Sequence, residues 1–427
     1  MFGSLKPLTL AALASGCVCL AFSHAAKAEP TANNSAQALV EEKPVVQPLL
    51  TLTGEFWSNV HGGTQTGSRW LGVAALSVEV DLARIGGAKN SAFIAQIYGL
   101  KNQHKETGIT DLTGAFNSVS GWDAEDMLRV GNLHYRQTWR DDATLLKVGQ
   151  LGIDDDFVGS DYVSLFANAA FATTPAQIAT PLDAETNNAY AFGGYAVYTP
   201  GIFVSTKLSE IFNFQTGVYY GGPGQDEKKN HGYSYENAST SGVVVFAEAA
   251  WRFPVLIRTS TLRLGGAYHT GKFDNFSALL SGAENTTVRG LYSFYIGHDI
   301  VLCADSKGDP AVAVFWRGAV SPQQDRSVVK TYFDAGFNWF GPIASRPHDT
   351  AGVAISRTKF GRDYRALTGP DTLARYETTV EFTYRAHLTS HWSVQAGVQL
   401  FRHASDSEAT GNFRSATVLG VRTELAF

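Results

Sequence analysis

Residues 379–388 read TVEFTYRAHL and residues 392–400 read WSVQAGVQL, and these two neighbouring runs give the clearest indication of secondary structure in the chain. In each run, apolar side chains alternate with polar or small residues at every second position. A period of two places one set of side chains on each face of an extended strand, whereas a helix would show a period near 3.6. Both runs are therefore predicted to be β-strands with one apolar and one polar face.

The same alternation returns along the chain from Leu50 onward, in runs of about 8–11 residues separated by turn-forming residues. A strand that crosses a bilayer needs about 9–11 residues, whereas strands of soluble sandwiches average about five or six. Aromatic residues stand at the ends of several runs, as membrane barrels require: Trp139, Trp251, Trp339, Phe340 and Trp392. A soluble sandwich or propeller would also alternate, but these two features favour a transmembrane antiparallel β-barrel.

The length of the alternating region sets the expected number of strands. Residues 50–427 supply roughly 23 residues per strand for sixteen strands, which fits ten-residue strands joined by alternating short and long connections. Fourteen or eighteen strands fit the same length. We expect an all-β barrel domain over residues 50–427, with sixteen strands, short periplasmic turns and longer extracellular loops.

The first 28 residues have the features of a secretory signal peptide. Lys6 precedes an apolar run from Leu8 to Phe22, and residues 26–28 read AKA, a small-residue cleavage motif. A lipoprotein signal ending at Cys17 is the alternative interpretation. Cleavage after residue 28 would leave Cys303 as the remaining cysteine and would exclude an internal disulfide. Residues 29–49 are predicted to be a flexible periplasmic N-terminal segment.

The composition excludes several classes of protein. Charged residues make up 17% of the chain, below the roughly 25% of soluble domains, which argues against a disordered chain and a helical bundle. No run of about 18 apolar residues follows residue 28, so no transmembrane helix is expected. The net charge of −5 gives no reason to propose nucleic acid as a partner.

Short segments recur in a particular order along the chain: FWSNVHGG at 56–63, LLKVGQL at 145–151, DDDF at 154–157, SPQQDR at 321–326, DAGF at 334–337, DTAGV at 349–353 and VLGVRT at 418–423. In this order they resemble the carbohydrate-selective porins of the OprB family, over about residues 54–427. The resemblance implies a sixteen-stranded barrel of the bacterial outer membrane, through which monosaccharides such as glucose diffuse passively. The chain departs from the family pattern at residues 218–221, which read VYYG in place of VFDG.

The polar face of the strands is predicted to line the lumen, because the lipid-facing surface of a membrane barrel is apolar. The candidate pore-lining residues are Glu79, Asp81, Asn132, His134, Arg136, Lys147, Glu248, Arg252, Arg263, Asp334, Asn338, Glu381 and Arg385. Acids and bases are mixed among them, which suits a neutral polyol better than an anion, for which rings of Lys and Arg are expected. Alternatively, these residues are solvated wall residues or ion-pair partners.

Residues 151–189 form the longest segment without clean alternation. A short amphipathic helix is predicted within residues 162–171. Long loops in compact proteins are usually functional, so we expect this segment to fold into the barrel and narrow the pore; an extracellular cap is the alternative. Its acidic residues 154–156, with Asp161, could bind calcium or form a solvated acidic loop.

Other functions find less support in the sequence. No G-x-S-x-G motif is present, and the histidines His134, His269 and His387 lack ligand spacing, so we expect no enzyme, no cofactor and no metal. A general or differently selective small-solute porin is the main alternative. Expected partners are carbohydrates, outer-membrane lipids and the barrel-assembly machinery, which would recognise the C-terminal Phe427; formation of homo-oligomers stays open.

Overall fold

The computed structural model describes residues 44–103, 107–171, 198–222, 231–232, 241–255, 258–369, 373–404 and 414–427. The expected signal peptide and residues 29–43 of the expected N-terminal segment lie outside these residues. In the described part of the chain, no helix is long and apolar enough to cross a bilayer.

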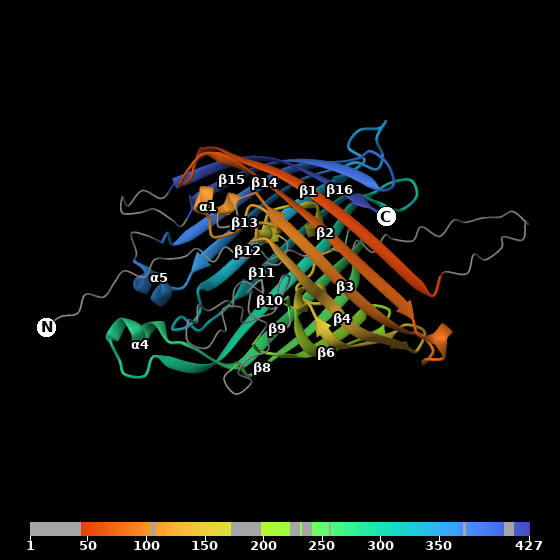
Figure 1. Ribbon diagram of the computed structural model, residues 1–427, viewed down its shortest axis with the longest axis horizontal. Helices are drawn as coiled ribbons and strands as arrows, with labels where there is room; N and C mark the ends of the chain where they lie inside the picture. Colours follow the sequence, from red (N-terminus) through yellow and green to blue (C-terminus); the bar gives the residue numbers. More distant parts are fainter. Residues whose placement is uncertain are drawn as a thin grey trace, which may run out of the picture.

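Sixteen antiparallel strands form one closed barrel, in which every strand pairs with its sequence neighbours and β1 closes onto β16 (Figure 1). The strands are β1 Val46–Gly62, β2 Gly67–Asp81, β3 Ser91–Asn102, β4 Met127–Trp139, β5 Thr144–Leu151, β6 Thr199–Ser209, β7 Phe212–Tyr220, β8 Val243–Val255, β9 Arg258–Asp274, β10 Thr287–Ala304, β11 Pro310–Val320, β12 Val329–Phe340, β13 Thr350–Phe360, β14 Tyr376–His387, β15 Trp392–Ala404 and β16 Arg414–Ala426. The predicted barrel of sixteen strands is confirmed.

The first and last strands, β1 and β16, meet where the barrel closes. The backbone N–H of Phe427 donates to the carbonyl of Leu50 at 2.9 Å, which places the C-terminal residue in register beside β1. Strand β1 begins at Val46, which pairs with Val80 of β2. Four residues that the sequence placed in the lead-in are therefore part of the barrel wall, because their backbone groups find partners on β2.

The two rims of the barrel differ in the length of their connections. At the rim that holds the C-terminus, strands are joined by short turns such as 140–143, 210–211 and 388–391. At the opposite rim lie the longer connections, among them those with α4 (Phe276–Ser281) and α5 (Arg362–Thr368), which protrude together in Figure 1. One rim thus has short turns and the other long loops, as predicted; in outer-membrane barrels the short turns are periplasmic and the long loops extracellular, and the two rims are named accordingly.

Side chains alternate between the outer surface and the interior, as the period of two requires. Large apolar residues such as Phe56, Phe294 and Phe382 lie exposed on the outer surface, where lipid covers them. Trp339 and Trp392 are also exposed and stand near the periplasmic rim, where an aromatic girdle was predicted.

Two loop segments fill much of the barrel interior. The first inner segment, residues 107–126, contains α1 (Ile109–Thr113), and the second inner segment, residues 152–171, contains 3-10 turns at Ile153–Asp155 and Val163–Leu165. Where the sequence indicated one helix within 162–171, the chain forms the 3-10 turn at Val163–Leu165, is extended at Phe166 and is helical again at residues 169–171. Both segments are largely buried against the inward faces of the strands.

Candidate pore constriction

The second inner segment is held by inward side chains from strands on several sides of the barrel. Its Val158 N–H donates to Glu248 of β8 at 3.1 Å, and Arg317 of β11 donates to the Val158 carbonyl at 3.2 Å. Asn338 of β12 donates to the carbonyl of Tyr162 at 2.8 Å. The segment therefore crosses the lumen, which agrees with the prediction that residues 151–189 fold into the barrel as far as residue 171; residues 172–189 lie outside the described part of the chain.

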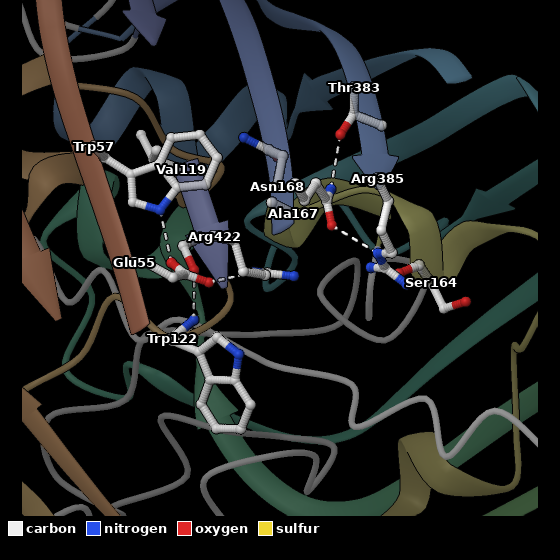
Figure 2. A network of polar contacts seen from close by, with 12 residues as sticks. Glu55, Trp57, Val119, Trp122, Ser164, Ala167, Asn168, Thr383, Arg385 and Arg422 are labelled. Atoms are coloured by element: carbon white, nitrogen blue, oxygen red, sulfur yellow. Dashed lines mark hydrogen bonds and ion pairs between the residues drawn. The ribbon is translucent and has the colours of Figure 1, made fainter. Parts of the chain in front are cut away.

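Glu381 of β14 holds the middle of this segment. Its carboxylate accepts hydrogen bonds from the backbone N–H groups of Ala167 and Asn168, each at 2.8 Å. On the next strand, Gln395 donates to the carbonyl of Leu165 at 2.7 Å. Arg385 of β14 donates to the carbonyl of Ser164 at 3.2 Å, and both residues are labelled in Figure 2. Inward residues thus satisfy the backbone groups that this irregular segment leaves without helical or strand partners.

The first inner segment is fixed in a similar way. Glu377 of β14 accepts from the backbone N–H groups of Phe116 at 2.6 Å and Asn117 at 2.8 Å. Within the segment, buried Asp123 accepts from the N–H groups of Ile109 at 3.1 Å and Thr110 at 2.7 Å. Burial raises the pKa of Asp123, and these hydrogen bonds oppose that rise.

The two inner segments are also joined directly. Gly121 N–H donates to the Ala167 carbonyl at 3.2 Å, and Ala169 N–H donates to the Ser118 carbonyl at 3.0 Å. The wall leaves room for this pair at Gly352 of β13, where an added Cβ would lie 2.6 Å from Leu165 Cδ2. The two segments therefore form one body packed against the wall.

Several interior charges form ion pairs. Arg317 pairs with Asp334, and Arg263 lies between Asp299 and Asp161. Near β1, Glu55 accepts from the indole Nε1 of Trp57 at 2.6 Å and pairs with Arg422 of β16 (Figure 2). The interior thus presents paired charges of both signs that also offer hydrogen-bond donors and acceptors.

The predicted pore-lining residues all lie on the inward face or at its periplasmic edge. Seven of the thirteen contact the second inner segment directly: Asn132, Lys147, Glu248, Arg263, Asn338, Glu381 and Arg385. Asp334 holds it indirectly, because its partner Arg317 donates to the carbonyls of Val158 and Phe171.

The other candidate residues lie away from the inner segments or make no contact with them among the hydrogen bonds described. Glu79 pairs with Arg136 across β2 and β4, and both side chains are about one-third exposed. Asp81 accepts from the N–H of Ala83 in the periplasmic turn at 3.0 Å. His134 is buried, whereas Arg252 is exposed near the end of β8.

Four charged residues that hold the interior together escaped the sequence analysis: Glu55, Asp299, Arg317 and Glu377. Arg317 carried a usable signal, since it is the one charge in the otherwise apolar run 311–320. An ionisable residue in such a strand must face the barrel interior and find a partner there. Its partners, however, could not be named without the registers of the strands.

The acidic residues 154–156 are connected to the wall. Asp155 accepts from Asn132 at 2.8 Å and Asp156 accepts from Lys147 at 2.6 Å. Burial raises the pKa of Asp155 to about 6, the Asn132 hydrogen bond lowers it, and the neighbouring Asp156 raises it further. These carboxylates serve here to attach the start of the second inner segment to β4 and β5.

We predict that Glu381→Leu loosens the second inner segment without opening the barrel. The change leaves two buried N–H groups without acceptors, at a cost of about 1–3 kcal/mol each. Single-channel recordings should therefore show more open-state current noise than those of the native protein. Glu79→Gln, which lies away from the inner segments, is the control and should record as quietly as the native protein; equally quiet Glu381→Leu channels would contradict the prediction.

Comparison with known proteins agrees with this architecture. The family model described as "Carbohydrate-selective porin, OprB family" matches residues 65–427. The chain is similar to the high-pH structure of Pseudomonas putida OprB, with 21% identity, a TM-score of 0.77, and coverage of 90% of this chain and 94% of that chain. It is also similar in fold to the Acinetobacter baumannii outer membrane channel DcaP, with 8% identity, a TM-score of 0.52, and coverage of 90% and 97%. No curated protein sequence matches.

Proposed function

Because the chain belongs to the carbohydrate-selective porin, OprB family, and is an outer-membrane porin for sugars, we propose that neutral monosaccharides such as glucose are the solutes that it passes. The observation that carries this proposal is the pairing of interior charges around the second inner segment. Paired charges offer donors and acceptors to sugar hydroxyls, while their fields largely cancel and attract neither anions nor cations strongly.

Arg385 is the residue that we propose for direct contact with the sugar. Its guanidinium donates to two neutral acceptors, Gln395 Oε1 at 3.0 Å and the Ser164 carbonyl at 3.2 Å. A guanidinium has five N–H donors, so further donors can reach a sugar hydroxyl beside the inner segment. Arg136, which is partly exposed on the wall, is proposed as a second contact.

Liposome swelling tests the proposed selectivity. Vesicles that contain the purified protein should swell faster in glucose than in a charged solute of matched size, because the paired charges favour a neutral solute. Arg385→Ala and Arg136→Ala should each change the rate for glucose while the protein keeps its folded, heat-modifiable mobility. Equal rates for glucose and the charged solute would leave a general small-solute porin as the function.

We further propose that the chain matures as the sequence suggests. Residues 1–28 would be removed as a signal peptide, and the assembly machinery of the outer membrane would recognise Phe427 at the end of β16. The exposed ring of Phe427 beside Leu50 supports the second point. N-terminal sequencing of the protein from outer membranes should begin at Glu29.

A further inference from the structure

Four basic side chains gather at the extracellular rim on the outer surface of the barrel. They are Arg357 and Lys359 of β13, Arg375 directly before β14, and Arg402 of β15, and we call them the basic rim. Arg357, Arg375 and Arg402 are exposed, whereas Ser356 and Thr358, the neighbours of Arg357 in sequence, are buried. By alternation, Arg357 and Lys359 therefore point away from the lumen.

The strand registers place the basic rim directly above the apolar belt. Thr378 of β14 pairs with Arg357 on one side and with Arg402 on the other, so these two cations stand at one level. Two residues further from the rim, Val380 pairs with Ile355 and with Leu400 in the same way. The outer surface thus changes from basic to apolar over two residues along β13 and β15.

Three of the four charges converge on one aromatic ring. Around the ring centroid of Tyr376, the guanidinium carbon of Arg357 lies at 4.3 Å, that of Arg375 at 5.3 Å, and the ammonium of Lys359 at 5.8 Å. Cation–π contacts stabilise such groups, but they leave the net positive charge in place. Within the described part of the chain, no carboxylate pairs with any residue of the basic rim.

Clustered like charges repel one another, and the repulsion grows as the surroundings become less polar, as they do beside a bilayer. An anion bound among these cations would offset their repulsion. At this level of an outer-membrane barrel, the anionic groups nearest to the surface are phosphates of the outer-leaflet lipid. Arg binds phosphate through paired N–H donors, and basic clusters at the membrane boundary recognise phosphorylated headgroups.

We propose that the basic rim binds the phosphate groups of a phosphorylated outer-leaflet lipid of the lipopolysaccharide class. The lipid's acyl chains then lie along Ile355, Val380 and Leu400, while Arg357 and Arg402 hold phosphate from either side of Thr378. This site faces the membrane, so the proposal is independent of which sugar passes through the lumen.

Native mass spectrometry of the purified full-length protein in detergent tests this site. The probes are bisphosphorylated lipid A, the same lipid after enzymatic dephosphorylation, and inorganic phosphate. Arg357→Gln combined with Arg402→Gln should weaken binding of bisphosphorylated lipid A by about tenfold, because each cation near a headgroup contributes to the attraction. Dephosphorylated lipid should bind the native protein about tenfold more weakly than the phosphorylated form.

The matched control removes two cations that lie at the extracellular rim but outside the basic rim. Lys272 of β9 and Arg289 of β10 are paired in register, and Lys272→Gln with Arg289→Gln should leave lipid A binding unchanged. Glucose swelling rates of both double variants should equal the native rate, which shows that the barrels are folded. A loss of less than about fivefold in the Arg357/Arg402 variant, equal binding of dephosphorylated lipid, or displacement of the lipid by millimolar inorganic phosphate would overturn the proposal.

Discussion

Deleting residues 160–171 is expected to raise the single-channel conductance about two- to threefold, because ionic current through a wide pore follows its open cross-section. The deleted residues contact inward side chains of β10, β11, β12, β14 and β15, so they occupy the space between these walls. Their anchors, such as Glu381 and Arg385, would then face water inside a lumen that the strands alone define. Planar-bilayer recordings in potassium chloride measure this directly.

The control deletion removes residues 276–283, which include α4 and belong to the extracellular rim (Figure 1). It removes eight residues, whose buried Phe276 packs against Tyr364 of α5, and none of the eight contacts the second inner segment among the hydrogen bonds described, so the conductance should stay near the native value. Unchanged conductance after deletion of 160–171 would show that the narrowest point lies elsewhere. The glucose selectivity of the deleted channel should also fall, since Arg385 loses its neighbour Ser164.

Arg317→Met is expected to destabilise the protein by about 3–5 kcal/mol, the cost of leaving a buried carboxylate without its counter-charge. Both Arg317 and Asp334 are almost completely buried. The guanidinium also donates to the carbonyls of Val158 and Phe171, so the substitution releases two points of the second inner segment. The neutral donors to Asp334, which include the Tyr332 hydroxyl at 3.0 Å and the backbone N–H of residue 317, would remain, but the counter-charge would be lost.

The free energy of unfolding, measured in urea with lipid-refolded protein, tests this prediction. The double variant Arg317→Met with Asp334→Leu should recover part of the loss, because it removes the uncompensated charge as well. Arg362→Gln is the control for an exposed pair: Arg362 is 79% exposed beside Asp363, and such pairs contribute about 0–1 kcal/mol. A similar small effect of both single substitutions would refute a structural role for the buried pair.

The strands could be predicted closely because their signal is local. Runs such as 379–388 and 392–400 alternate strictly; β14 contains the first run up to His387, and β15 contains all of the second. The start of β1 was placed four residues too late, since Val46–Leu49 are stabilised by pairing with β2 and not by any pattern of their own. Pro48 within this stretch made it look like a turn or linker.

The alternation predicted that the candidate pore-lining residues point inward, but it could not predict what each of them contacts. Glu381 was expected to line the pore, and its inward direction agrees with the alternation; its contacts with Ala167 and Asn168 join residues more than 200 positions apart. The partners of Arg317 and Glu377, which were not among the candidates, are likewise distant in the sequence. Their importance lies in what they bind, which the sequence around them does not contain.

The barrel, its two faces and the segment that interrupts them could be inferred from the sequence, because a period of two and its absence are properties of the chain within a few residues. Folding is needed to show which charges pair, where the second inner segment crosses the lumen, and that Arg357 and Arg402 share one level beside Thr378. These facts depend on strand register, and a shift of register changes every cross-strand neighbour without altering the alternation that the sequence displays.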